Sequence, residues 1–201
     1  MCGKTAVNMS DLGVDIFTFS GHKFHGPKGA GGIFVNKNLK LKPLSFGGGQ
    51  ERSVRPGTHN LASIYSMSTA LEESQLELIR ENNAQKIRDY FESEVVKTIS
   101  DSFVVGSEYD RLPNTSYICI NGVNTDVLIS NLSTIALSNG SACNSYSHDI
   151  SHVAKEMKDA NVIPENVLRF SFSRYNTKNE VDTALSIIAA EVAYIRKVGI
   201  K

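Results

Sequence analysis

A lysine in a glycine-rich turn is the first residue of this chain that could carry chemistry. Lys23 follows Ser20, Gly21 and His22, at the point where a short apolar run typical of a buried strand ends. A lysine partly removed from water has a lowered pKa, and its neutral amine can add to an aldehyde such as that of pyridoxal phosphate. Ser20 and His22 would then offer donors to the phosphate. On this spacing alone, a solvated loop lysine beside a turn histidine is the commoner arrangement.

A cysteine among small residues is the second candidate. Cys143 lies in the run 138–145, which is rich in Ser, Asn and Gly, whereas Cys119 has the apolar neighbours of a buried cysteine. An exposed, mobile thiol suits a nucleophile that accepts an atom in a pocket and carries it to a partner. An inert surface cysteine is the alternative. His148 and His152 would form a zinc site with Cys143 only if one helix covers both histidines.

Arg169 is a charged residue inside an otherwise apolar strand at 167–171. A buried guanidinium needs a carboxylate or phosphate partner, because its five donors cannot be left dry. The carboxylate of an amino-acid substrate is one such partner, and a charge-assisted bond of this kind is worth about 1.5–3 kcal/mol. A structural salt bridge, or the outward face of an edge strand, explains the residue equally well.

Other ligand motifs fail in the glycine-rich zone. Gly21 and Gly26 have the spacing of a P-loop, but Pro27 stands where its lysine must be. A dinucleotide-binding glycine motif is broken by Phe34 in its last position. No residue near His22 and His25 completes a set of metal ligands, so we expect no metal.

The elements that position these residues follow from apolar periodicity. Strands at 14–20 and 31–35 flank a glycine-proline turn and should be neighbours in a sheet. No Gly or Pro occurs between residues 58 and 105, which predicts one long helix or two nearly continuous helices. Further expected elements are strands at 103–105, 116–120, 134–137 and 167–173 and helices at 126–132 and 150–158. A capping box at 177–180 predicts the start of a final helix.

Composition and charge narrow the classes of partner. The 201 residues carry 21 Lys+Arg and 21 Asp+Glu, so the formal net charge is zero with the histidines neutral. We therefore expect neither nucleic acid nor a membrane as a partner. No run approaches the ~18 apolar residues of a membrane span, and the N-terminus lacks a signal-peptide core, which favours the cytoplasm or an organelle matrix. The three cysteines are an odd number at wide spacing and do not form a disulfide framework.

Taken in order, these segments resemble the cysteine desulfurases of the NifS and IscS type, pyridoxal phosphate enzymes of fold type I in the class V aminotransferase family. Five motifs carry the resemblance over essentially the whole chain. They are Ser20-Gly21-His22-Lys23 with Gly26-Pro27-Lys28-Gly29, Gly47-Gly48-Gly49-Gln50-Glu51-Arg52, Arg55-Pro56-Gly57-Thr58, Gly140-Ser141-Ala142-Cys143 and Leu168-Arg169-Phe170-Ser171. The resemblance implies an α/β fold, with the C-terminal part of the cofactor-binding large domain at 1–60. A connecting helix and the small α+β C-terminal domain would occupy 61–201.

The resemblance also implies removal of sulfur from L-cysteine, which leaves L-alanine and an enzyme persulfide. Lys23 would hold the cofactor and move protons on the substrate, with His22 as a catalytic and cofactor-binding residue beside it. Ser20 would bind the cofactor phosphate, and Thr58 would reach the phosphate in the other subunit of a homodimer. Arg169 would anchor the substrate carboxylate. Cys143, as thiolate, would attack the substrate sulfur and carry it away.

The sulfur would pass to an acceptor protein, a scaffold or relay, in iron–sulfur cluster assembly or other sulfur-compound biosynthesis. The surroundings of Cys143 and the run Ser151-His152-Val153 resemble the long-loop class that serves iron–sulfur assembly. Family members are about twice this length, and the regions that supply their ring histidine and pyridine-binding aspartate precede the part that matches. We therefore expect that this polypeptide alone binds pyridoxal phosphate weakly and has little or no desulfurase activity.

Two alternatives remain open at this point. A selenocysteine lyase or another class V relative would keep the fold and change the substrate. A non-catalytic remnant, or a subunit of a split enzyme with an N-terminal partner polypeptide, would keep only part of the site. Cys143 discriminates the first alternative, because a transaminase has no need of a mobile thiol.

Overall fold

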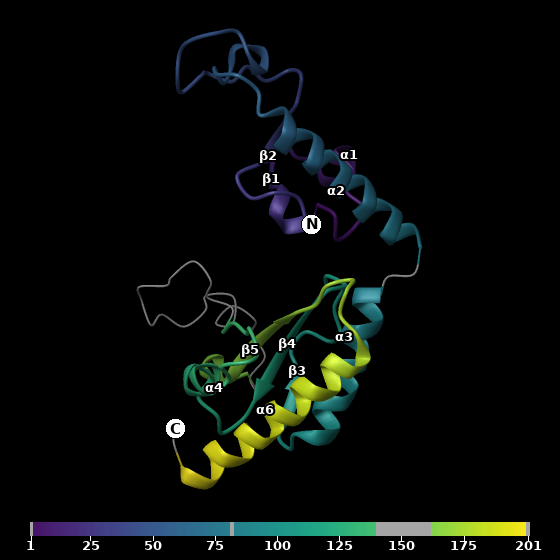
Figure 1. The fold of residues 1–201 in the computed structure, drawn as a ribbon, viewed down its shortest axis with the longest axis vertical. Coiled ribbons are helices and arrows are strands. Elements are labelled where there is room, and N and C mark those ends of the chain that lie inside the picture. The colour runs from purple at the N-terminus through teal and green to yellow at the C-terminus, as the bar shows by residue number, and fades with distance from the viewer. Residues whose placement is uncertain (1, 81–82, 140–161, 200–201) are drawn as a thin grey trace. The chain divides into compact units, whose positions relative to one another are not determined.

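A computed structural model describes residues 2–80, 83–139 and 162–199 of the chain (Figure 1). The chain divides into two compact units, Met1–Glu81 and Asn82–Lys201. Both units mix helices with antiparallel strands. Helix α2 (Leu61–Ile79) groups with the first unit, and the predicted domain boundary at residue 60 stays a prediction.

The first unit is built on a β-hairpin. Its elements are α1 (Met9–Leu12), β1 (Ile16–Ser20), the 3-10 turn η1 (Gly21–Phe24), β2 (Gly31–Val35), the 3-10 turn η2 (Glu51–Ser53) and α2 (Leu61–Ile79). Strands β1 and β2 pair antiparallel from Ile16 opposite Val35 to Ser20 opposite Gly31. The predicted pairing of these two strands is therefore confirmed.

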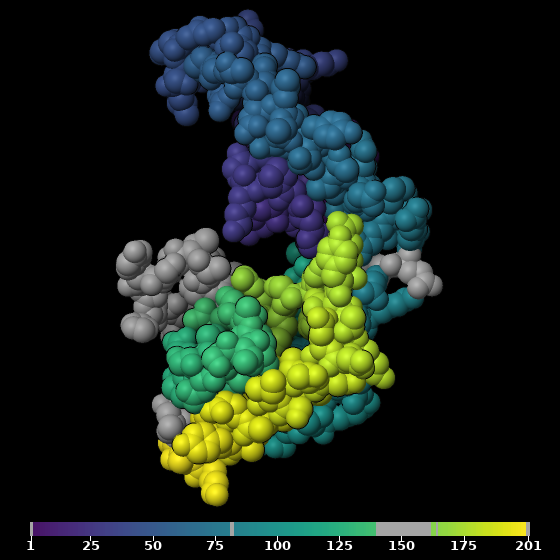
Figure 2. Space-filling model, in the orientation of Figure 1, coloured from purple at the N-terminus to yellow at the C-terminus, as the bar shows by residue number. Residues whose placement is uncertain are grey.

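The first unit buries little apolar surface. Phe24 is the only hydrophobic side chain in the described part of this unit that is buried, at 0% exposure. Leu44 and Phe46, in the segment between β2 and η2, are 101% and 87% exposed, and the apolar side chains Leu61, Tyr65 and Ile79 of α2 are exposed too. Figure 2 shows the segment after β2, in blue, projecting from the rest of the unit.

The second unit has a three-stranded antiparallel sheet in the order β3-β4-β5. Its elements are α3 (Asn83–Thr98), β3 (Ser102–Val104), β4 (Thr115–Ile120), α4 (Thr125–Asn131), the 3-10 turn η3 (Pro164–Asn166), β5 (Val167–Ser171) and α6 (Lys178–Val198). Helices α3 and α6 contact each other and pack on one face of the sheet (Figure 1). Thr177 and Glu180 form the predicted capping box of α6.

The core of the second unit is built from apolar stripes on its two long helices. The buried residues of the two long helices are spaced by three or four and meet alternate residues of β4 and β5. Phe91 of α3 lies against Phe170 of β5, with ring centroids 4.6 Å apart. The buried core residues are Ile87, Phe91 and Val95 in α3, Val181, Leu185, Ile188, Val192 and Ile195 in α6, and Ile118, Ile120, Leu168 and Phe170 in the sheet.

One predicted element is wrong and another lies outside the described residues. The chain forms no strand at 134–137, because after α4 it turns with the Ile135 N–H donating to the Leu132 carbonyl and meets β5 only at Ser138. The helix expected at 150–158 lies in the range that the structure leaves undescribed. Among the described helices, none has the length and apolar composition needed to cross a bilayer.

Candidate functional site

The turn that carries Lys23 closes directly after β1. The N–H of Gly21 donates to the carbonyl of Ala30 at 2.8 Å, which extends the hairpin by one step. The N–H of Gly26 donates to the carbonyl of Gly21 at 2.9 Å and closes the loop on itself. The sequence places the candidate residues in this turn, and the hydrogen bonds hold it at the end of the strand.

The period of the turn decides which side chains face outward. In a 3-10 helix, residues three apart lie above one another. Gly21 and Phe24 are buried, so the two residues between them, His22 and Lys23, are exposed. Ser20, the last residue of β1, is exposed as well. The structure thus brings an amine, an imidazole and a hydroxyl together at one end of the hairpin.

Glycine is required opposite this turn for lack of space. A Cβ atom at Gly31 would lie 2.6 Å from the carbonyl oxygen of Phe19, and one at Gly32 would lie 2.3 Å from the Phe19 ring. The contact at Gly31 is with backbone and leaves no room for a side chain, so glycine there lets β2 approach β1 beside Ser20. A side chain at Gly32 would instead require the Phe19 ring to move.

The segment before Thr58 is bent by its own hydrogen bonds. The side-chain carbonyl of Gln50 accepts from the N–H of Gly57 at 3.1 Å, and the His59 and Glu51 side chains lie 3.3 Å apart. Glu51, Arg52 and Ser53 have left-handed φ values of 46°, 55° and 65°. Thr58 is exposed in this unit and, among the described contacts, makes no hydrogen bond to the Lys23 turn.

Arg169 lies on the sheet face opposite the helices of the second unit. Its N–H donates to the Ser138 carbonyl at 2.7 Å, and its guanidinium reaches the Ser138 hydroxyl at 3.5 Å. Tyr117 of β4 is its cross-strand neighbour. Arg169 is half-buried, and its guanidinium forms no ion pair with an Asp or Glu of the described residues.

The other predicted site residues lie outside the turn that carries Lys23. Lys23 and Arg169 belong to different units. Cys143 lies outside the described residues. The three residues at the end of the hairpin therefore form the part of the predicted site that the structure assembles.

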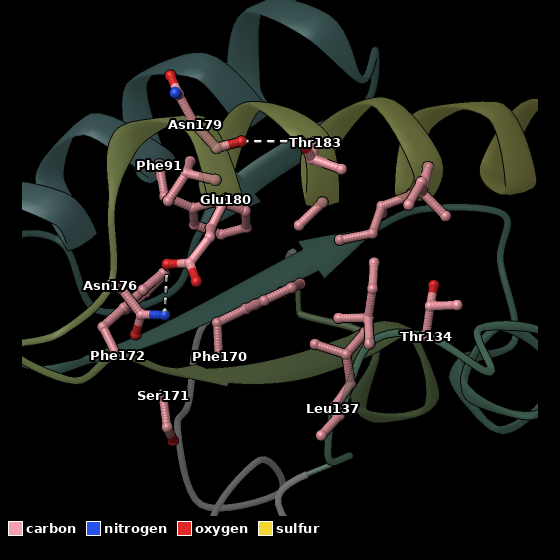
Figure 3. Close-up of a pocket in the computed structure, with 16 residues that line it drawn as sticks. Phe91, Thr134, Leu137, Phe170, Ser171, Phe172, Asn176, Asn179, Glu180 and Thr183 are labelled. Carbon is pink, nitrogen blue, oxygen red and sulfur yellow. Dashed lines mark hydrogen bonds between the residues drawn. The ribbon is translucent and has the colours of Figure 1, made fainter.

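A cavity of about 540 Å³ in the second unit was not foreseen from the sequence (Figure 3). Phe170 and Phe172 of the β5 region, Leu137, and the first turns of α6 line it. Figure 3 shows Ser171 on the other side of the strand from Phe170. Arg169 is not among the residues that line this cavity.

The rim of this cavity carries a fixed negative charge. The Thr177 N–H and the Asn176 amide donate to the Glu180 carboxylate at 2.8 and 3.3 Å, and these bonds hold the pKa of Glu180 below its usual value. On the far side of α6, the hydrogen bond to Asp182 raises the pKa of Tyr90 to about 12. Neither group would change its charge near neutral pH.

Comparison with known proteins assigns the family. The model of the aminotransferase class-V family matches residues 1–184. The chain belongs to this family. A cysteine desulfurase IscS of Dictyoglomus turgidum is 36% identical over 201 residues, covering 98% of this chain and 51% of the relative. A cysteine desulfurase NifS of Azotobacter vinelandii is 34% identical over 200 residues, with 98% and 50% covered. The class-V chain thus spans about half the length of these curated relatives.

Solved structures agree with this assignment. A NifS-like protein superposes with a TM-score of 0.82 at 30% identity, covering 96% of this chain and 50% of that one. A NifS-like protein from Rickettsia africae gives a TM-score of 0.81 at 26% identity, with 96% and 51% covered. The predicted fold class, the α/β fold of type I pyridoxal phosphate enzymes, is therefore confirmed.

Sequence reasoning missed the residues that support the site from behind. Ser74 of α2 touches the Lys23 turn from 50 positions along the chain. Tyr117, beside Arg169, has a buried hydroxyl without a hydrogen-bond partner in the structure. No local pattern marks either residue, because both depend on contacts between elements.

Proposed function

We propose that this chain is the C-terminal half of a cysteine desulfurase, an enzyme that removes sulfur from L-cysteine and releases L-alanine. The observation that carries the proposal is the position of Lys23, exposed in the turn at the end of β1 with Ser20 and His22 exposed beside it. The curated relatives named cysteine desulfurase, which match nearly the whole chain, support the choice of reaction.

The residues of this turn fit pyridoxal phosphate. The Lys23 amine would hold the cofactor's aldehyde carbon, while the Ser20 hydroxyl and the His22 ring N–H would donate to its phosphate. Thr58 of the other subunit in a homodimer would add a third donor to the phosphate. When bound, the cofactor withdraws electrons from the substrate's Cα. Lys23 would take a proton from the substrate and return one, with His22 beside it.

Arg169 and Cys143 would act on the substrate itself. The guanidinium of Arg169 would bind the carboxylate of L-cysteine, since no described acidic side chain competes for it. The Cys143 thiolate would attack the substrate sulfur. A sulfur–sulfur bond then forms, the carbon–sulfur bond breaks, and its electron pair stays on the substrate carbon, which takes up a proton. Cys143 ends as a persulfide and the substrate as L-alanine.

The proposed roles of Cys143 and Thr58 imply partners for this chain. Cys143 would hand its sulfur to an acceptor protein, a scaffold or relay in iron–sulfur cluster assembly or related biosynthesis. Thr58 would serve the phosphate of a second subunit in a homodimer. The exposed apolar side chains of the first unit, such as Phe46 and Tyr65, support cover by further protein, either that subunit or the half that the relatives carry before the matching region. We place the reaction in the cytoplasm or an organelle matrix.

Trapping of the cofactor tests the role of Lys23. The chain is incubated with pyridoxal phosphate and reduced with borohydride, and the modified peptides are measured by mass spectrometry. We expect Lys23 to carry more label than Lys28, which is exposed five residues away and serves as the internal control. Equal labelling of the two lysines would remove the basis of the proposal.

Transfer of sulfur tests the role of Cys143. The chain, saturated with added pyridoxal phosphate and in excess over L-cysteine labelled with ³⁵S, is analysed without reductant, so that even a slow single transfer is detected. We expect label on Cys143, released by dithiothreitol and absent from Cys143→Ser, with the Lys23 label of that variant unchanged. Label that persists in Cys143→Ser would refute the assignment of the acceptor thiol.

A further inference from the structure

The buried side of the Lys23 turn contains a polar contact that the proposed chemistry does not use. Ser74 is the only residue of α2 that is buried, at 4% exposure. Its hydroxyl lies 3.3 Å from the carbonyl oxygen of Phe24, the residue after Lys23, and 2.8 Å from the carbonyl of Ala70 in its own helix. The hydroxyl therefore bridges α2 and the turn.

The bond to Ala70 alone would be ordinary, because serine in a helix often bonds the carbonyl four residues back. Ser66 does the same on the exposed part of α2, with its hydroxyl 2.8 Å from the carbonyl of Ala62. Ser74 differs in being buried and in having a second acceptor on another element. A buried carbonyl needs a donor, and the Ser74 hydroxyl is within reach of the Phe24 carbonyl. Its single proton is shared between two carbonyls, with the shorter bond to Ala70.

Tight packing keeps Ser74 and Phe24 together. Gly3 has a left-handed φ of 69°, and a Cβ there would lie 2.4 Å from Phe24 Cβ and 3.3 Å from Ser74 Cβ. At the other end of the turn, a Cβ on Gly21 would lie 3.1 Å from the Met67 side chain of α2. Helix α2 thus touches the inward residues Gly21 and Phe24, which leaves the residues between them to point outward.

We propose that Ser74 is a positioning residue for Lys23. The hydroxyl fixes the carbonyl of Phe24, and with it the backbone that directs the Lys23 amine toward the cofactor. Ser74 does not touch cofactor or substrate in this arrangement. The inference rests on the proposed function, in which Lys23 holds pyridoxal phosphate.

The test compares Ser74→Ala with Ser66→Ala, which removes the same intrahelical bond and no contact to the turn. The readout is the borohydride-trapped label on Lys23 divided by that on Lys28, measured in each full chain. Loss of one hydrogen bond to the turn should lower this ratio about 2- to 12-fold in Ser74→Ala. Ser66→Ala should keep the wild-type ratio. Ser74→Cys, which fills the site but donates weakly, should lie between them and carries the test if Ser74→Ala does not fold.

Thermal unfolding of the same variants separates positioning from plain stability. A lower melting temperature in Ser74→Ala with an unchanged label ratio would overturn the proposal and leave Lys23 as the cofactor lysine. A wild-type chain that labels both lysines equally would overturn the proposed function, and this inference with it. A ratio that falls only in the Ser74 variants, measured well below their melting temperatures, supports the inference.

Discussion

Phe24→Ala should unfold the first unit and spare the second. The side chain is 0% exposed and lies against the Phe19 ring, with centroids 6.2 Å apart. Burying about 150–250 Å² of aromatic surface at about 25 cal/mol per Å² stabilises a fold by about 4–6 kcal/mol. Phe-to-Ala changes in packed cores cost about 3–5 kcal/mol. Since no other hydrophobic side chain in the described part of this unit is buried, little remains to offset such a loss.

Hydrogen exchange followed by mass spectrometry measures this effect one peptide at a time. In Phe24→Ala, peptides that cover β1 and β2 should exchange at the rate of unfolded chain, while those from β4 and α6 keep their protection. Phe46→Ala is the matched control, because it removes the same ring from a side chain that is 87% exposed. The Lys23 label should also fall in Phe24→Ala, since the turn loses its buried anchor.

Two results would refute this reasoning. Unchanged protection of β1 and β2 in Phe24→Ala would mean that contacts other than this ring hold the first unit together. An equal loss of protection in α6 would mean that the two units unfold as one.

Three further predictions concern the second unit. Tyr117→Phe should leave the free energy of unfolding unchanged or raise it by about 1 kcal/mol, because the hydroxyl is buried without a partner; a clear loss in urea unfolding would contradict this. Arg111→Lys should cost about 1–2 kcal/mol in the same assay, because Arg111 donates two bonds to Glu92, at 2.6 and 3.0 Å, and both side chains keep some exposure. Burial raises the Glu92 pKa, but the hydrogen bonds from Arg111, the nearby Ser116 hydroxyl and the nearby guanidinium charges together lower it. No change in the free energy of unfolding would mean that the pair is solvated. Glu180→Gln should remove part of the pH dependence of the free energy of unfolding. Because the pKa of Glu180 is lowered in the folded state, its carboxylate stabilises the fold above the unfolded pKa of about 4.3, and this contribution is lost as pH falls through the lower folded pKa. Wild type and variant should therefore converge in acid, and a constant difference would exclude the carboxylate as the cause.

The fold was predictable where the pattern is local. The stripe of α6 and its capping box lie within one element, so spacing alone gives the start of the helix and its buried face. The paired strands β1 and β2 flank a short turn and could be read in the same way. The error at 134–137 arose because an apolar run after α4 predicts a strand, whereas the chain there turns back on the end of the helix and forms only one bridge to β5, at Ser138.

The site was predictable only where its residues are neighbours in the chain. Ser20, His22 and Lys23 come together because Ser20 ends β1 and the other two lie in the turn that follows it at once. The contact of Ser74 with Phe24 spans 50 positions, and the cavity beside α6 joins three separate segments. That Arg169 has no acidic partner among the described residues likewise depends on the tertiary structure. Such features arise from packing between elements, and no periodic pattern in the sequence indicates them.

The two units differ in how much of their own stability they supply. The second unit has a closed core of helix and sheet side chains, whereas the first, which carries Lys23, buries one aromatic ring and exposes side chains such as Leu44 and Tyr65. A protein surface that covers these side chains only in the folded state would stabilise the first unit, and with it the turn at the end of β1. By linkage, a partner that binds only the ordered turn must also tighten the binding of pyridoxal phosphate there. The Lys23 label should therefore rise with chain concentration if the covering surface belongs to a second copy.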